Sequence, residues 1–376
     1  MGILGMPNEL LLLIGENLSI KDLYHLLLAC RQLSSVLTEQ LRKLGLQDVG
    51  QRTALQWAAD RGHAPLAELA ISKGAEIDKP DPGQSGRTPL HSAAKNNHVN
   101  IIRILVMNKA SISAHDSDGM TPLHYAALCE GAEATKALLG EGADMTRMNS
   151  AMLMPPLLAA EGGSVDSMMA FVDAGFDLAT RGHDGQTVLH KAAGREPMMG
   201  YLLSQPEAKM SLNAQDLRGR TPLHLEKNVT NIKLLLRHGA AMEVVDRCGD
   251  TAGHVAAATL DLPCVKAFVD AGFDVKASRR EGWTVIHAAI FNRNPHVLEY
   301  LLRAGGRSII NAKDSQGHTA LRTLLDHSSS KASVEGPDVY SLLVRYGASL
   351  GREDWFSFYR MRVTRARIWQ LVGSLE

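Results

Sequence analysis

A seven-residue phrase recurs along the chain at intervals of about 33 residues, and this period constrains the fold more than any other feature. The clearest copies read Thr-Pro-Leu-His-x-Ala-Ala and begin at Thr88 and Thr121. Successive copies are 35, 33, 33, 33, 34, 30, 33 and 35 residues apart. Such a period indicates small similar units that stack in a row, so that each unit packs only against its neighbours. The nine copies are anchored at Thr53, Thr88, Thr121, Met154, Thr187, Thr221, Thr251, Thr284 and Thr319.

Each unit carries the start and stop signals of two short helices. The threonine is a good helix N-cap, and the proline that follows it suits the first helical position. The alanine pair keeps this first helix thin, so that neighbouring units stack closely. A second, apolar helix follows, as in residues 101–106, and a pair such as Gly142-Ala143 ends it. A turn such as Asp118-Gly119 precedes the phrase and suits the tip of a hairpin.

The period and the phrase together resemble the ankyrin repeat. The resemblance covers residues 50–350, about 80% of the 376-residue chain. It implies an all-α solenoid of helix pairs with β-hairpin loops, whose concave face binds partner proteins. A stack of thin layers rich in Ala and Leu also accounts for the small number of aromatic residues, 18 in the whole chain.

Six of the 15 histidines occupy the fourth position of the phrase. We predict that their imidazole rings form hydrogen bonds with neighbouring backbone and have no catalytic role. These residues are His91, His124, His190, His224, His254 and His287.

Residues 1–46 do not follow the repeat. They contain 15 leucines and predict three short helices that are apolar on more than one face. About 45 residues cannot bury a stable core alone, so the excess apolar surface must face the repeats or another protein.

The string from Met6 to Ile14, followed by Leu18-Ser19, Asp22-Leu23 and Cys30-Arg31, resembles an F-box. The F-box family uses this module to dock on the linker subunit of cullin-type ubiquitin ligases. An F-box placed before ankyrin repeats is similar to a fungal family of F-box plus ankyrin proteins. The alternative is a helical cap on the apolar face of the first repeat. The resemblance implies that the linker subunit contacts Pro7, Leu10, Leu11, Ile14, Leu18, Leu23 and Leu26.

The ankyrin resemblance also predicts which residues face a partner. In that fold the residue before each anchor and the pair after each alanine pair point to the concave side. Trp283 and Phe291 are large apolar side chains at such positions, and exposed aromatic residues are candidate hot spots. The alternative is that these side chains pack against the neighbouring hairpin. The predicted groove residues are Arg87, Met120, Leu128, Arg220, Trp283 and Phe291.

Two units depart from the rule. The fourth has Met154 in place of the threonine, lacks the histidine and has no glycine in its hairpin segment. The step from the sixth to the seventh anchor is three residues short, and Glu226-Lys227 replace the alanine pair, which predicts a local change in stacking. After the ninth unit, apolar residues at helical spacing predict a capping helix in residues 351–376.

Charge and motifs argue against several classes of function. The chain has 40 Lys+Arg and 40 Asp+Glu, so no bulk field draws it to nucleic acid or to an anionic membrane. The apolar run at 10–14 is too short to predict a signal peptide or a membrane span. No phosphate-loop, dinucleotide, zinc-protease or hydrolase motif occurs, so we predict no enzyme, cofactor or metal. The four cysteines have no CxxC spacing and are interpreted as reduced, buried thiols of a cytoplasmic or nuclear protein.

These observations predict a substrate-recognition subunit of a cullin-based ubiquitin ligase that is not itself catalytic. Its F-box would bind the linker subunit, and its ankyrin groove would bind a protein target that the sequence does not identify. The alternative is an ankyrin scaffold or inhibitor with no role in ubiquitination. A groove that binds a small molecule or performs catalysis is a third hypothesis.

Overall fold

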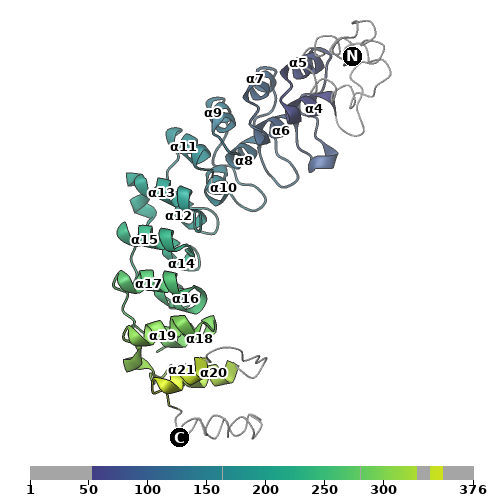
Figure 1. Cartoon of the computed structure of the whole chain (residues 1–376). Helices are drawn as coiled ribbons and strands as arrows, with labels where there is room; N and C mark the ends of the chain where they lie inside the picture. The colour runs from purple at the N-terminus through teal and green to yellow at the C-terminus, as the bar shows by residue number, and fades with distance from the viewer. Residues whose placement is uncertain (1–52, 163, 280, 328–338, 350–376) are drawn as a thin grey trace, which may run out of the picture. The chain divides into compact units, whose positions relative to one another are not determined.

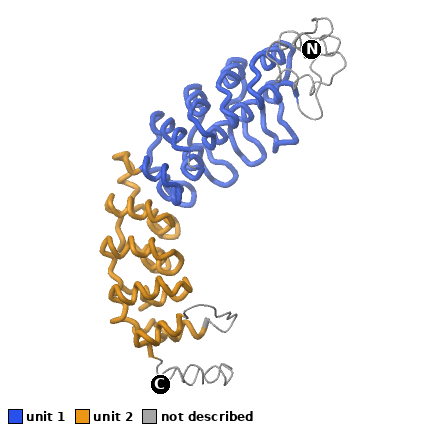
Figure 2. Tube along the Cα trace, viewed as in Figure 1, with its two compact units in different colours: residues 1–202 blue, residues 203–376 orange. Residues whose placement is uncertain are grey.

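The computed structural model describes residues 53–162, 164–279, 281–327 and 339–349. In this part of the chain, short helices are joined by loops, and β-structure is limited to isolated bridges (Figure 1). None of the helices described is long and apolar enough to cross a membrane. The chain divides into two compact units, residues 1–202 and 203–376 (Figure 2). The F-box-like residues 1–46 and the expected cap at 351–376 lie outside the described residues.

The described helices alternate between an inner helix, which begins at the recurring phrase, and an outer helix that follows it. Within each unit, successive inner helices contact one another and so do most successive outer helices, which forms an all-α solenoid. The inner helices are α4 (Ala54–Arg61), α6 (Pro89–Lys95), α8 (Pro122–Ala127), α10 (Pro155–Gly162), α12 (Val188–Lys191), α14 (Pro222–Leu225), α16 (Ala252–Thr259), α18 (Val285–Asn292) and α20 (Ala320–His327). The outer helices are α5 (Ala64–Ser72), α7 (Val99–Met107), α9 (Glu133–Gly140), α11 (Val165–Asp173), α13 (Glu196–Ser204), α15 (Val229–Arg237), α17 (Leu262–Asp270), α19 (Pro295–Arg303) and α21 (Val339–Arg345). Short 3-10 helices lie in the loops at η2 (Pro82–Gln84), η3 (Pro206–Ser211) and η4 (Gly306–Ile309).

The core is a thin layer between the inner and outer helices. In the second repeat, Leu90 and Ala93 on α6 are fully buried, as are Ile101, Ile102 and Leu105 on α7. Each described helix has only four to nine residues, so its apolar stripe is covered by the partner helix and by the next repeat rather than by one large core.

The recurring phrase forms a reciprocal cap at the start of the inner helix. At α6, the backbone N–H of Thr88 donates to Nδ1 of His91 at 3.1 Å, and the Thr88 hydroxyl lies 2.8 Å from the same nitrogen. The Thr88 side chain accepts from the backbone of His91 in return. The same box forms at α8, α12, α14 and α18. Histidine therefore does at the third helical position what Glu or Gln does in the usual capping box.

The other nitrogen of the imidazole ring joins one repeat to the next. In four of the six phrase histidines Nε2 donates to a backbone carbonyl in the loop of the following repeat, which confirms the predicted backbone hydrogen bond for these four. Because Nδ1 accepts an amide proton while Nε2 meets a carbonyl, the ring is neutral and carries its proton on Nε2. The pairs are His91 with Met120 at 2.9 Å, His124 with Leu153 at 3.0 Å, His224 with Asp250 at 3.1 Å and His287 with His318 at 3.2 Å.

The first repeat shows that a neutral amide fills the same role. Gln56 stands at the histidine position of α4, and its Oε1 accepts the backbone N–H of Thr53 at 2.8 Å. Its Nε2 donates to the Lys79 carbonyl, in the loop that leads to the next repeat, at 2.7 Å. One acceptor and one donor on a single neutral side chain therefore satisfy both the cap and the link between repeats.

The loops before the anchors are held by an Asp or Asn side chain. Oδ1 of Asp116 accepts the N–H groups of Asp118 and Met120 at 2.9 Å each. The predicted β-hairpins shrink to isolated antiparallel bridges, such as Val245 with Thr251, because this side chain takes an amide proton that a ladder would use. The same side-chain bonds occur at Asn149, Asp216, Asp246 and Asp314.

Glycine at the loop tip lets neighbouring loops touch. Gly119 has a φ of 70°, and a Cβ there would lie 2.8 Å from the backbone nitrogen of Ser150 in the next loop. This approach allows the Ser150 N–H to donate to the Asp118 carbonyl at 2.9 Å. The fourth repeat lacks the glycine, and Met152 adopts the left-handed conformation in its place, with a φ of 59°. Cys248, predicted to be buried, is exposed because it lies at another loop tip.

The shortened sixth repeat loses residues from its inner helix. Helix α14 has four residues, and Glu226 then leaves the helical conformation with a ψ of 136°. Its buried carboxylate accepts the N–H groups of Lys227 and Asn228 at 2.8 Å each, and the side-chain amide of Asn231 at 3.0 Å. Glu226 therefore ends one helix and caps the entry to the next, in the place of the missing alanine pair.

The seventh repeat compensates for a missing leucine. Gly253 occupies the leucine position of the phrase, and the ring of Phe273 fills the space, since a Cβ at Gly253 would overlap that ring. Phe273 stands where several other repeats have alanine, as in Gly239-Ala240. The ring also meets His254 edge to face, with 6.0 Å between the ring centroids. Here the series of histidine links is interrupted, because Nε2 of His254 is buried without a hydrogen-bond partner.

We expect Gly253→Leu to destabilise the chain alone and to be rescued by Phe273→Ala, because the pair restores the Leu and Ala of the other repeats. Gly253→Leu alone overpacks the site and should lower the unfolding free energy by about 1–3 kcal/mol. Phe273→Ala alone leaves a cavity and should cost about 3–5 kcal/mol. The double variant should recover at least about half of the summed loss. Urea denaturation of the four proteins measures the coupling, and strict additivity would contradict the exchange of volume.

We also expect the chain to lose stability on mild acidification. Burial lowers the pKa of five phrase histidines below the ordinary 6.5, because desolvation disfavours the imidazolium ion. The unfolded chain therefore takes up protons first as the pH falls. The contribution of these rings is fully present above about pH 6.5 and decreases below it, by up to about 1.4 kcal/mol per pH unit for each ring. These rings belong to His91, His124, His224, His254 and His287.

The double variant His91→Gln plus His124→Gln is the matched control, because Gln56 already shows that an amide supports both hydrogen bonds. It should keep the stability of the parent chain near neutral pH and show a shallower decrease between about pH 7.5 and about pH 5, above the range in which ordinary carboxylates titrate. Urea midpoints at several pH values measure both quantities. An unchanged slope would mean that other groups cause the acid sensitivity.

Candidate protein-binding face

We define the inner face as the side formed by the residue before each anchor and by the exposed positions of the inner helices. The residues that precede the anchors are all half-buried where the structure describes them, so each is packed on one side and open on the other. Leu128 and Phe291, which follow the small pair of their helices, are 46% and 45% exposed. The residues before the anchors are Arg87, Met120, Leu153 and Gln186 in the first unit, and Arg220, Asp250, Trp283 and His318 in the second.

In the first unit, Arg87 lies against a tyrosine that the sequence analysis did not select. The Arg87 guanidinium carbon is 5.2 Å from the centroid of the Tyr125 ring. The Tyr125 hydroxyl donates to Oδ2 of Asp116 at 2.6 Å, and His91 meets the ring edge to face. Burial and the bond to Asp116 raise the pKa of Tyr125, so the hydroxyl keeps its proton. Tyr125 occupies the variable position of the phrase, between His124 and Ala126. This position could have identified it as a residue of the inner face.

Met120 and Leu128, the other predicted residues of this unit, each approach the following repeat. The Met120 sulfur accepts from the Asn149 side-chain amide at 3.1 Å. A Cβ on Gly162 would lie 2.9 Å from Cδ2 of Leu128, so the leucine leans on the next inner helix. Part of each side chain therefore packs against the neighbouring repeat, as the alternative interpretation has it. Leu128 nevertheless keeps 46% of its surface exposed.

In the second unit, Trp283 and Phe291 form one aromatic stack. The ring centroids are 5.9 Å apart with 23° between the planes, and His287 stacks on Trp283 at 5.1 Å. The guanidinium carbon of Arg279 lies 4.8 Å from the Trp283 centroid. Arg279 is held in turn by Asp250, with 2.5 Å between Nη1 and Oδ2. This Arg279–Trp283–Phe291 stack places a cation and two aromatic rings next to one another.

The sequence analysis selected both aromatic residues but missed Arg279. The arginine lies four residues before the tryptophan, and the loop brings the two together because the Arg279 N–H donates to the Trp283 carbonyl at 2.8 Å. The spacing of four across a tight loop is the signal that could have identified it.

Several charged side chains on the inner face form ion pairs with nearby carboxylates. Nε and Nη2 of Arg220 both donate to Oδ2 of Asp216, at 3.0 and 2.8 Å, and the Asp216 side chain is 2% exposed. In the first unit, Lys191 lies 3.2 Å from Asp184 and 3.8 Å from Glu161. Arg220 therefore contributes its stem and the edge of its guanidinium group to the face but little net charge.

The geometry first defines a class of protein, a helical repeat protein in which short helix pairs stack through nearest-neighbour contacts. The family model for ankyrin repeats (3 copies) matches residues 66–149, 225–314 and 261–354, which together cover more than half of the chain. The chain belongs to the ankyrin-repeat family.

Curated relatives share the repeats at low identity. The B-cell lymphoma 3 protein homolog of mouse is 28% identical over 224 residues, which are 56% of this chain and 48% of the relative. Human ankyrin repeat and SOCS box protein 16 is 32% identical over 214 residues, 54% of this chain and 46% of the relative. The NF-kappa-B inhibitor zeta of Bos taurus is 26% identical over 229 residues, 56% of this chain and 31% of the relative. The chain thus spans less than half the length of each of these proteins.

We expect Phe291 to contribute little to folding, as a residue kept for binding should. Phe291→Ala removes a ring that is 45% exposed and should cost about 1 kcal/mol, the value of one aromatic pair. The neighbouring Ile290 is 3% exposed, and Ile290→Ala should cost about 2–4 kcal/mol. Urea denaturation of both variants measures the difference. Equal losses would show that Phe291 belongs to the core and not to a binding face.

Proposed function

We propose that this chain is a non-catalytic adaptor that holds a target protein on its inner face and presents it to a cullin-based ubiquitin ligase. The observation that carries the protein-binding half is the Arg279–Trp283–Phe291 stack, because it leaves a large aromatic ring 45% exposed on this face. Aromatic and arginine side chains are the groups most often found at interaction hot spots.

The local charge balance supports a target recognised by shape and apolar contact. A partner placed on the inner face of the second unit meets aromatic rings together with the paired Arg220 and Arg279. Burying a charge that already has its counterion costs less than burying an unpaired one. In the first unit, Arg87 over Tyr125 forms a second patch with the same chemistry.

The ligase half of the proposal rests on the sequence of residues 1–46. Its implied docking positions, of which Pro7, Leu11 and Ile14 lie at the start of the module, match the F-box pattern. Such an adaptor needs no catalytic group, because it acts by raising the concentration of target lysines near the charged conjugating enzyme. We place this activity in the cytoplasm or the nucleus, where that system operates.

A second candidate function is favoured by one relative. NF-kappa-B inhibitor zeta is 26% identical over 229 residues, and its name describes an inhibitor. Under this alternative the chain binds a protein through its repeats and has no link to ubiquitination. Residues 1–46 would then be a helical cap on the first repeat.

Binding of the purified full-length chain to the linker subunit, measured by surface plasmon resonance, tests the ligase half. We expect the intact chain to bind, and Leu11→Ala plus Ile14→Ala to weaken binding by about tenfold or more, because two apolar contacts are lost. The matched control is Leu12→Ala plus Leu13→Ala, which removes a similar apolar area outside the implied contact set. If the intact chain does not bind, or if both variants lose binding equally, the scaffold alternative is favoured.

The protein-binding half has a separate test that does not involve the linker subunit. Proteins that co-purify with the intact chain should be reduced by about tenfold or more with Phe291→Ala. The variant Leu128→Ala changes an exposed aliphatic residue at the corresponding position of a repeat in the first unit. Its effect, compared with that of Phe291→Ala, shows which unit's inner face binds the partner. Unchanged co-purification with Phe291→Ala would exclude the aromatic stack as the binding element.

A further inference from the structure

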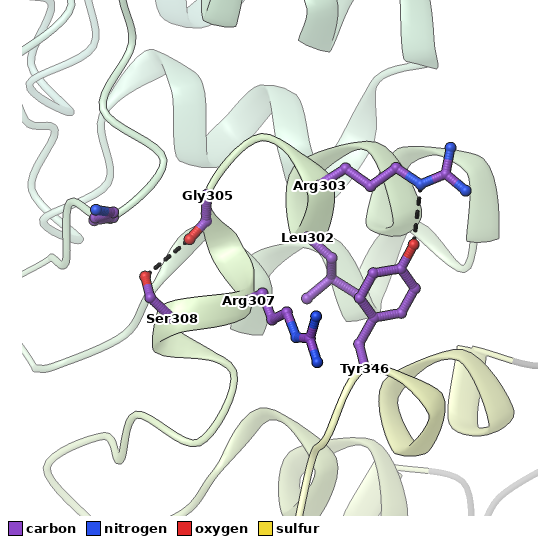
Figure 3. A pocket seen from close by; sticks show the side chains of 7 residues that line it. Leu302, Arg303, Gly305, Arg307, Ser308 and Tyr346 are labelled. Atoms are coloured by element: carbon purple, nitrogen blue, oxygen red, sulfur yellow. Dashed lines mark hydrogen bonds between the residues drawn. The ribbon is translucent and has the colours of Figure 1, made fainter.

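A second surface of the second unit has a different character from the inner face. An open pocket of about 600 Å³ lies where the end of α19, the 3-10 helix η4 and the residue after α21 meet (Figure 3). Its lining includes three exposed basic side chains together with Leu302, Ser308 and Tyr346. The basic side chains are Lys276, Arg303 and Arg307.

The fold brings these cations together from three separate segments. Arg303 is the last residue of α19, Arg307 belongs to η4, and Lys276 comes from the loop of the preceding repeat. Gly305 has a φ of 128° and turns the chain sharply between the two arginines. A Cβ on Gly305 would lie 3.8 Å from Cε of Lys276, so the lysine stem passes over the bare backbone of the glycine.

One of the three cations already has a counterion. Arg303 donates from Nη2 to Glu299 at 2.6 Å. Its Nε donates to the Tyr346 hydroxyl at 3.0 Å (Figure 3). The Tyr346 hydroxyl also lies 3.4 Å from the same Glu299 oxygen. The Ser308 hydroxyl donates to the Gly305 carbonyl at 2.9 Å.

The other two cations, Lys276 and Arg307, form no ion pair with any described residue. The pocket therefore carries two positive charges that the described chain does not balance. This differs from the inner face, where Arg220 and Arg279 each have a carboxylate partner. The charge difference indicates a ligand with about two negative charges.

We propose that this pocket binds the phosphate group of a phosphorylated serine or threonine in a partner protein. A phosphate monoester carries about −1.5 to −2 charges at neutral pH and three strong acceptor oxygens, which matches the two unbalanced cations. A carboxylate would leave one of them unbalanced. Arg307 suits a fork-shaped contact with two oxygens, and Lys276 supplies a point charge.

The volume and the apolar wall agree with a side chain on a peptide. A volume of about 600 Å³ exceeds that of a phosphate group alone and leaves room for the residues on either side of it. The ring of Tyr346, which is half-buried, offers an apolar wall for the stem of the modified residue. The proposal rests on the protein-binding half of the proposed function and not on the ligase half.

Fluorescence polarisation with the full-length chain tests this assignment. The probes are three labelled peptides that differ only at a central residue, which is phosphoserine, serine or glutamate within a run of glycine and alanine. We expect the phosphoserine peptide to bind about tenfold more tightly than the other two. Lys276→Gln plus Arg307→Gln should remove this preference, while Arg237→Gln, an exposed arginine on α15 outside the pocket, should leave it intact.

Three outcomes would overturn the proposal. Equal binding of the phosphoserine and glutamate peptides would assign the pocket to single carboxylates. Binding that is unaffected by the double variant would place the phosphate elsewhere. Tighter, Arg307-dependent binding of a duplex oligonucleotide would assign the pocket to nucleic acid. Both substituted residues are exposed, and unchanged thermal unfolding checks that the variants fold. The assay uses neither the linker subunit nor Phe291, so its failure is distinct from a failure of either half of the proposed function.

Discussion

The stack depends on a recurring buried hydrogen bond between neighbouring repeats, which four histidines and Gln56 form. Nδ1 of a histidine accepts the backbone N–H at the start of its own helix, and Nε2 donates to a carbonyl of the following loop, as His124 does toward Leu153. A single side chain therefore sets both the start of a helix and the register of its neighbour. Gln56 meets the same two demands with an amide, which shows that the requirement is a neutral donor and acceptor rather than an imidazole.

Because the links between repeats fix the register, side chains from successive repeats meet in defined pairs on the inner face. Arg87 reaches Tyr125 in the next repeat, and Asp250 reaches Arg279 in the same way. Arg220 and Arg279 are neutralised by carboxylates on this face, and its exposed aromatic surface is the feature best suited to bind a partner. The pocket beside η4 has the opposite character, since two of its cations have no counterion in the described chain. The second unit thus combines an apolar face with a separate basic pocket.

The departures from the repeat rule are compensated locally, in ways that only contacts reveal. Gly253 looks like a defect in the sequence, but the Phe273 ring supplies its missing volume. Glu226 replaces an alanine pair and uses its carboxylate to satisfy the backbone where the helix is cut short. Met152 takes a left-handed conformation where other loops have glycine. A one-dimensional stack tolerates such changes because each repeat touches only its neighbours, so a local substitution is enough to restore the packing.

The sequence by itself determined the period, the helix pairs, the Thr-Pro starts and the backbone role of the histidines, because these follow from hydrogen bonds within one repeat and its neighbour. Through the resemblance to ankyrin repeats it also predicted that Trp283 and Phe291 point to the concave side. Only the tertiary structure decided which cations are neutralised. Arg220, selected from the sequence, is tied to Asp216, whereas Lys276 and Arg307 share an unbalanced pocket. The reason is that charge balance depends on distances between loops of different repeats, which repeat spacing alone does not specify.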